Sequence, residues 1–341
     1  MSRLDSKPQI GKLASDLGLK PSGRPVSEIV DYVRRRVEKV VKNYKCSDLA
    51  SLLSAAAHEA KTIIREVHCD ADLDQIIAEF VPRGERIFAN LRNELRNHDY
   101  AITLKRQHAA KFDLPFVSVI DCRGPKMFAS YFTKWHELAH LFTLTPQMRL
   151  VFRRTHAAAV LDPEESLMDI IAGEMAFWPA FLDAGHHQKI SFELIERIRS
   201  EFCPQASYQA SLIGIVKALP KPCILLSAQL DLKKSEKLDC LQMQLSNCAE
   251  PSPQLRAVHV TVNRAARDEN ISMHAHWRVP ERSAIYRAFE QRTHFEAVEN
   301  LDWWATSSGS RLRSCTVLVK ARYLPETVTA LLVPTNADSH E

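Results

Sequence analysis

Glycine is scarce in this chain, at 9 of 341 residues, where a soluble protein usually has about 7%. No two glycines lie two residues apart, so the GxGxxG turn that binds dinucleotides is absent. No glycine precedes Lys-Ser or Lys-Thr, which excludes a phosphate-binding P-loop. We therefore do not expect the usual nucleotide-driven chemistry, nor a collagen-like or glycine-rich low-complexity chain.

Long apolar runs and paired cysteines are also missing. Residues 1–24 are polar and lack the apolar core of a secretory signal. No apolar stretch reaches the ~18 residues that a membrane-spanning helix needs. The eight cysteines contain no CxxC pair, which favours reduced structural thiols. Together these absences predict a cytoplasmic protein with no membrane segment.

The overall composition is that of an ordinary globular protein, with 45% hydrophobic and 25% charged residues. Its length predicts two or three domains. The net charge of +4 is too small to require a nucleic-acid partner. One basic run is typical of a solvated helix face, and a contact with nucleic acid stays the alternative. The run comprises Arg34, Arg35, Arg36, Lys39, Lys42 and Lys45.

The periodicity of apolar residues predicts an α+β fold in successive segments. These are a loose arm over 1–25, a helical region over 26–99, a core over 100–220, and a mixed β-rich domain of unknown role over 221–341. In the core, short strands are expected at 101–106, 116–120 and 127–131, followed by helices at 163–184, 191–202 and 207–219. In the last segment, strands are expected at 223–230, 258–262, 271–277 and 315–321.

The strongest motif is the HExxH sequence from His136 to His140. Residues four apart share one face of a helix, so both imidazoles can bind the same ion. Zinc accepts imidazole nitrogens and keeps a position open for water in catalytic sites. Glu137 follows the first ligand and is placed to take a proton from that water. By composition alone, about 0.04 such motifs are expected in a chain of this kind.

A third ligand is needed, and the next predicted helix offers carboxylates. Glu165 and Asp169 lie four apart, so one can bind the metal while the other orients a ligand histidine. Glu164, Glu174 and His156 remain competing ligands. The alternative interpretation of the acidic pair is a favourable charge at a helix N-terminus.

Gly173 lies in the middle of the same predicted helix. An interior glycine costs about 1 kcal/mol relative to alanine. With Ala172 beside it, the glycine predicts close packing of this helix against the HExxH helix.

These segments resemble the ImmA/IrrE family of metallopeptidases, a gluzincin-like group. The likeness rests on the Phe132–His136 lead into the motif, on Glu165–Pro179, and on Ser207–Lys217. It covers roughly residues 100–220. The departures are a charged Lys134 before the motif and Phe177-Trp178-Pro179 at the end of the second helix.

The resemblance implies a zincin-like core and a zinc-dependent endopeptidase that cuts a protein or peptide. Relatives cleave a partner repressor protein, so such a repressor is the expected substrate. Zn²⁺ would be held by His136, His140 and Glu165, with Asp169 behind a ligand histidine and Glu137 as the base.

The substrate is expected to add as a strand along the edge near 127–131. Tyr131 and His156 are candidate oxyanion donors. A different class of function stays open, namely a non-catalytic DNA- or protein-binding regulator with a structural or degenerate metal site. A second metal site is an alternative at His259, His274 and His276, although exposed histidines are the more common outcome.

Overall fold

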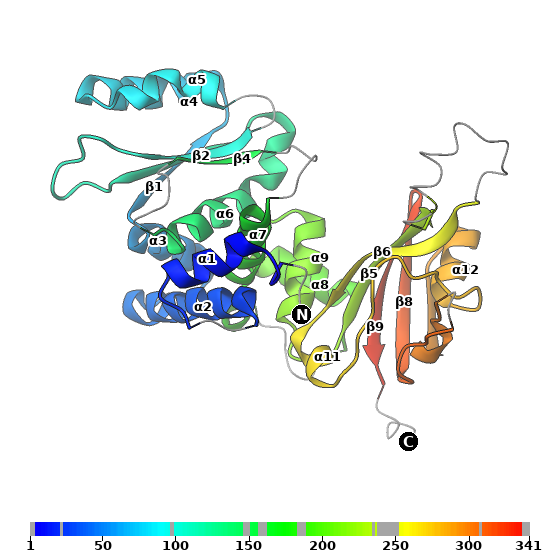
Figure 1. Cartoon of the computed structure of the whole chain (residues 1–341). Coiled ribbons are helices and arrows are strands. Elements are labelled where there is room, and N and C mark those ends of the chain that lie inside the picture. Colours follow the sequence, from blue (N-terminus) through cyan, green and yellow to red (C-terminus); the bar gives the residue numbers. More distant parts are fainter. Residues whose placement is uncertain are drawn as a thin grey trace, which may run out of the picture. The chain divides into compact units, whose positions relative to one another are not determined.

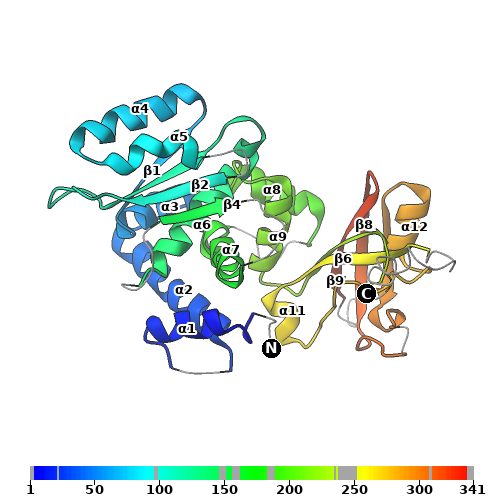
Figure 2. The same cartoon turned by 45° about the horizontal axis from the view of Figure 1, so that its top comes forward.

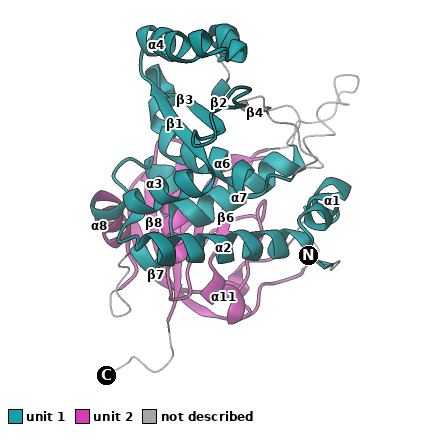
Figure 3. Cartoon of the chain, turned by 90° about the vertical axis from the view of Figure 1, so that its left-hand side faces the viewer, with its two compact units in different colours: residues 1–181, 201–210 teal, residues 182–200, 211–341 magenta. Residues whose placement is uncertain are grey.

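The computed structural model describes residues 4–20, 23–95, 99–145, 151–155, 162–182, 189–233, 236, 252–306 and 309–335, with 151–155 described by their backbone alone. Helices and strands are mixed, and the strands form two separate sheets (Figure 1). The chain divides into two compact units, residues 1–181 with 201–210, and residues 182–200 with 211–341 (Figure 3). None of the described helices combines the length and the apolar character needed to cross a bilayer.

The first unit begins with three helices, α1 (Pro8–Asp16), α2 (Pro25–Tyr44) and α3 (Leu49–Glu59). Helix α1 lies within the segment that the sequence predicts as a loose arm. Pro8 starts it, and its apolar face is buried through Ile10, Leu13 and Ala14. Three apolar residues on one helical face provide the burial that keeps this segment folded.

A four-stranded sheet forms the centre of this unit, in the order β1-β3-β2-β4. The strands are β1 (Thr62–Val67), β2 (Asp99–Lys105), β3 (Phe116–Asp121) and β4 (Val151–Thr155). Strands β1 and β3 are parallel, and the other neighbours are antiparallel. Strand β4 therefore forms one edge of the described sheet.

Helices cover both faces of this sheet (Figure 1). On one face lie α4 (Asp70–Phe80), the 3₁₀ turns Val81–Arg83 and Arg86–Asn90, and α5 (Leu91–Glu94). Their side chains share an apolar core with β2 and β3 that includes the stacked rings of Phe80 and Phe88. The opposite face receives α3 and α6 (Ser130–Phe142).

Two predictions about strands in this unit are wrong. Residues 127–131 are not a strand, because Pro125 starts a 3₁₀ helix over Gly124–Ala129 that leads directly into α6. Conversely, the region predicted as helical over 26–99 contains strand β1. β-Branched Thr62, Ile63 and Ile64 favour the extended backbone there.

Helix α7 (Pro163–Ala176) packs beside α6 (Figure 2). The Asp162 carboxylate caps its first turn by accepting a hydrogen bond from the Glu164 amide. The helix ends at Ala176, short of the predicted boundary at 184, because Pro179 follows in a 3₁₀ turn over Pro179–Phe181. The next two predicted helices are confirmed as α8 (Phe192–Phe202) and α9 (Tyr208–Ala218).

The second unit contains a five-stranded antiparallel sheet in the order β6-β5-β9-β8-β7. Its strands are β5 (Ile224–Asp231), β6 (Gln254–Val262), β7 (Phe295–Asn300), β8 (Thr316–Leu324) and β9 (Thr327–Pro334). Among the described residues, strand β6 is followed by the short helices α11 (Arg264–Asp268) and α12 (Ala284–Gln291), and β7 by a 3₁₀ turn over Leu301–Trp303. Helix α12 packs on this sheet around the buried Trp304.

Residues 271–277 are not a strand, contrary to the expectation. Ile271 and Met273 are buried and Ser272 and His274 exposed, as alternation predicts. However, the left-handed backbone of His276, at φ 70°, breaks an extended run. The alternation of buried and exposed residues here belongs to a loop that packs on the core.

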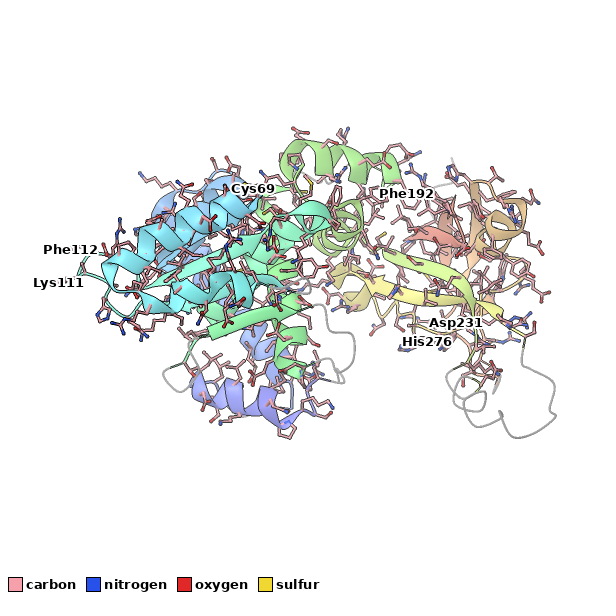
Figure 4. The ribbon with its side chains drawn as sticks, turned by 90° about the horizontal axis from the view of Figure 1, so that it is seen from above. Cys69, Lys111, Phe112, Phe192, Asp231 and His276 are labelled. Atoms are coloured by element: carbon pink, nitrogen blue, oxygen red, sulfur yellow. The ribbon has the colours of Figure 1, made fainter. Side chains whose placement is uncertain are left out.

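Arg322 joins α8 to the sheet of the second unit. Its guanidinium bonds Glu193 at 2.6 Å and Glu196 at 2.5 Å, and it stacks 4.5 Å from the ring centre of Phe192. Figure 4 labels Phe192 at the start of this helix. These contacts hold the start of α8 against strand β8. The β-rich character expected for the C-terminal part of the chain is confirmed by the five-stranded sheet.

Candidate metal centre

Helix α6 carries the HExxH motif and is buried along almost its whole length. Trp135, Leu138, Ala139 and Phe142 are completely buried, and the motif residue His136 is only 1% exposed. Burial restricts the rotamers of the motif side chains, because a side chain that is packed on all sides can adopt few other conformations.

Two imidazole nitrogens and the carboxylate of Glu165 form a triangle at this face. His136 Nε2 lies 3.1 Å from His140 Nε2 and 3.0 Å from Glu165 Oε2. His140 Nε2 lies 3.2 Å from Glu165 Oε1. A tetrahedral zinc ion separates such ligand atoms by about 3.4 Å, so an expansion of a few tenths of an ångström would admit it. The donor set and its spacing fit zinc.

Asp169 lies behind this triangle. Its Oδ1 is 2.9 Å from His136 Nδ1. A carboxylate at Nδ1 holds the proton on that nitrogen and leaves Nε2 as the electron-pair donor. Glu165 and Asp169, four residues apart on α7, thus reach the two nitrogens of one imidazole.

The competing carboxylates have other surroundings. Burial alone would raise the pKa of Glu165, but its hydrogen bonds with His136 and His140 lower that pKa far below its ordinary value. By contrast, burial and nearby Asp162 raise the pKa of Glu164. Glu174 forms an ion pair at 2.6 Å with Arg34. Of the three glutamates on α7, Glu165 is the one that faces both histidines.

Glu137 is held from the sheet side. Its Oε2 accepts a hydrogen bond of 2.6 Å from the Thr103 hydroxyl on β2. Thr103 lies 2.8 Å from the Ser118 hydroxyl on β3, which lies 3.0 Å from that of Thr62 on β1. Glu137 Oε1 is also buried, and no described residue forms a hydrogen bond with it. One oxygen is therefore fixed by protein, while the other is available for a water or a substrate.

The three hydroxyls are site residues that the sequence analysis missed. Thr103, Ser118 and Thr62 lie on different strands, and strand register alone brings them into line. The sequence gives little sign of them, because Thr103 and Ser118 are single polar residues between apolar neighbours and Thr62 is the first residue of its strand. That sign becomes meaningful once the strand order is known.

The two candidate oxyanion donors have different outcomes. The Tyr131 hydroxyl donates to the Ala176 carbonyl at 2.6 Å, and burial raises its pKa. That bond joins α6 to the end of α7, so a role on substrate would require it to break. His156 lies outside the described residues.

Gly173 does not mark a close helix contact, contrary to the prediction. A Cβ built at Gly173 would meet no atom within 4 Å. The neighbouring Ala172 is fully buried instead. The small residue that lets α7 pack is therefore Ala172, and the glycine lies beside open space.

Two other predicted features are also resolved. His259, His274 and His276 are exposed, and they form no metal-sized group among the residues that the structure describes. Part of the basic run is used in packing, because Arg36 donates to the Phe142 carbonyl at 2.6 Å and lies over the Phe142 ring. Arg34 pairs with Glu174, whereas the rest of the run is exposed, as expected of a solvated face; these residues are Arg35, Lys39, Lys42 and Lys45.

No protein-family model matches this sequence, and no curated protein is significantly similar to it.

Proposed function

We propose that this chain is a zinc-dependent endopeptidase with a zincin-like core of the ImmA/IrrE kind. The observation that carries the proposal is the convergence of His136, His140 and Glu165 within 3.2 Å of one another. Glu137 on the same helix adds a buried Oε1 that no described residue bonds. Two imidazoles and one carboxylate are the ligand set of several zinc hydrolases.

A zinc ion held there would supply Lewis acidity, which activates water and polarises the scissile carbonyl. Glu137 has the geometry of a general base, since Thr103 anchors Oε2 and leaves Oε1 to accept a proton from water. The same oxygen then returns the proton to the leaving amine nitrogen. Asp169 keeps His136 in the tautomer that donates from Nε2.

The proposed substrate is an extended segment of a protein, with a partner repressor as the expected class. Strand β4 is the edge of the sheet that also contains β2, the strand that supplies Thr103. A peptide can add to such an edge through backbone hydrogen bonds. This edge replaces the segment 127–131, which is helical.

The test is a cleavage assay on a peptide library and on purified candidate repressors, read by mass spectrometry, with zinc content measured in parallel. We expect the purified chain to contain zinc and to cut a defined set of peptides. Glu137→Gln should retain zinc and lose cleavage, because the amide cannot accept the proton. Unchanged cleavage by this variant would overturn the mechanism.

The non-catalytic alternative predicts a different result. A regulator with a structural metal would bind zinc both as the wild type and as Glu137→Gln, and neither protein would cut a peptide. That outcome, with the zinc still dependent on Glu165, would remove the proposed activity while leaving the metal centre in place.

A further inference from the structure

A second group of metal-binding side chains lies where strands β1 and β3 end. It consists of Glu66, His68 and Cys122. The two strands are parallel and in register up to Val67 and Asp121, so the residues that follow emerge side by side. Figure 4 labels Cys69, the residue after His68, near this end of the sheet.

The ends of the two strands bring the three side chains together. Glu66 is the second-last residue of β1, and His68 directly follows its last residue, Val67. Cys122 packs with Ile120 and Ile64 on the face that α6 covers. The Cys122 amide donates to the Val67 carbonyl at 2.8 Å, which continues the strand pairing past the end of β3.

The spacing within the group suits a metal ion. One ligand atom from each residue lies within 4.8 Å of the others. Cys122 Sγ is 3.6 Å from Glu66 Oε2. A tetrahedral zinc ion holds a sulfur and an oxygen ligand about 3.5 Å apart, given its usual bond lengths. The thiol and the carboxylate are therefore already at the separation that binding requires.

Lys134 orients the carboxylate of this group. Its ammonium, which is almost fully buried, lies 2.8 Å from Glu66 Oε1. One oxygen of Glu66 is thus held by the lysine, and the other faces Cys122. An outer partner that fixes a ligand carboxylate is a regular feature of metal sites. This arrangement also gives a role to the charged residue that precedes the HExxH motif.

We propose that Glu66, His68 and Cys122 form a second metal site that takes Zn²⁺ or another divalent ion able to bind thiolate and imidazole together. On binding, the Cys122 S–H bond breaks, the proton leaves to solvent, and the sulfur electron pair forms the bond to the ion. No oxidant or reductant is needed. Three protein ligands leave one position for water, and exposed Glu66 and His68 give the ion a path from solvent.

This site is separate from the His136 centre and does not depend on the proposed peptidase activity. The two are connected through Lys134, which lies two residues before His136 on α6 and contacts Glu66. An ion bound at the second site would therefore affect the position of Lys134 on α6, the helix that also carries His136.

Cobalt(II) ions are a probe that separates the two sites. A Co²⁺–thiolate bond gives an intense near-ultraviolet charge-transfer band, and the His136 centre contains no sulfur ligand. We expect the reduced full-length chain to develop this band on titration with Co²⁺. A variant with His136 and His140 both changed to alanine should keep the band while it loses the other cobalt site.

Matched variants assign the ligands. Cys122→Ser should abolish the band, and His68→Ala should weaken the binding measured by the band at least tenfold. Cys69→Ser changes the exposed thiol next to His68 and should leave the band unchanged. Because His68 is exposed, its variant tests the site even if Cys122→Ser does not fold. Absence of the band in the reduced wild type, or unchanged affinity in His68→Ala, would overturn the proposal.

Discussion

The hydroxyl oxygen of Thr103 lies 2.6 Å from Glu137 Oε2, and both residues are fully buried. This bond joins strand β2 to the acidic residue of the HExxH motif. Ser118 and Thr62 extend it into a line of hydroxyls across the sheet. The sheet therefore does more than support α6, because it also sets the direction in which the Glu137 carboxylate points.

Thr103→Val should separate positioning of Glu137 from metal binding. The variant keeps the shape of the side chain and leaves a buried carboxylate oxygen without its donor, which costs about 1–3 kcal/mol. We expect lower stability and weaker peptide cleavage with unchanged zinc content. Thr103→Ser restores the hydroxyl and should recover most of the cleavage. Equal cleavage by the wild type and Thr103→Val would show that the bond has no role in activity.

Glu165→Ala and Glu164→Ala form a matched pair for the metal centre. Neighbouring positions on α7 point about 100° apart, and the structure directs Glu165 to His136 and His140. We expect zinc affinity to fall by more than about tenfold in Glu165→Ala and to stay near wild type in Glu164→Ala. Measurement of the zinc retained at the His136 centre after dialysis against a chelator distinguishes them. Equal loss in both variants would move the third ligand elsewhere.

Gly173→Ala should stabilise the protein. The position is helical, and an added methyl group meets no atom within 4 Å. Replacing an interior helical glycine by alanine is worth about 0.5–1 kcal/mol. Ala172→Leu is the contrasting variant, since its fully buried position has no room and should lose stability. Thermal unfolding measures both, and a destabilised Gly173→Ala would restore the close-packing interpretation.

Asp48 makes a pH-dependent contribution at the start of α3. It accepts a 2.7 Å hydrogen bond from the Ser51 amide, and this bond, with that of the Ser51 hydroxyl, lowers the pKa of Asp48. Because the pKa is lower in the folded state, the charged cap stabilises the folded protein fully above about pH 4, the pKa of Asp in the unfolded chain. This stabilisation is lost as the pH falls through the pKa of the folded state.

Asp48→Ala should therefore cost about 1 kcal/mol at neutral pH and progressively less in acid. Asp48→Asn keeps a capping oxygen without a titrating charge, so its stability difference from Asp48→Ala should stay constant with pH. Urea unfolding at neutral pH and at about pH 3 measures both differences. A penalty for Asp48→Ala that does not change with pH would contradict the assignment.

Local sequence patterns predicted a substantial part of this molecule. Three- and four-residue periodicity located α2, α8 and α9, and a run of apolar residues located β3. The periodicity of the helix also placed His136 beside His140, and Glu165 beside Asp169. These relations lie within one turn or one strand, where chain geometry fixes which side chains meet.

Errors arose where a local pattern had more than one physical cause. Alternating burial at 271–277 came from a loop, and Pro125 converted a strand-like stretch into a 3₁₀ turn. The prediction of a packing contact at Gly173 is wrong because sequence carries no information on the space around a residue. In each case the conformation or the packing depends on surrounding residues that the local pattern does not include.

The order of residues in the chain is enough to specify the reactive groups, namely two histidines on one helical face, a glutamate beside them, and carboxylates on a following helix. Which of those groups meet depends on how the elements pack. The packing of α7 against α6 selected Glu165 over Glu164 and Glu174, and strand register placed Thr103 on Glu137 and Cys122 beside Glu66. Such contacts join residues far apart in the chain, and only the burial of apolar faces between helix and sheet brings them together.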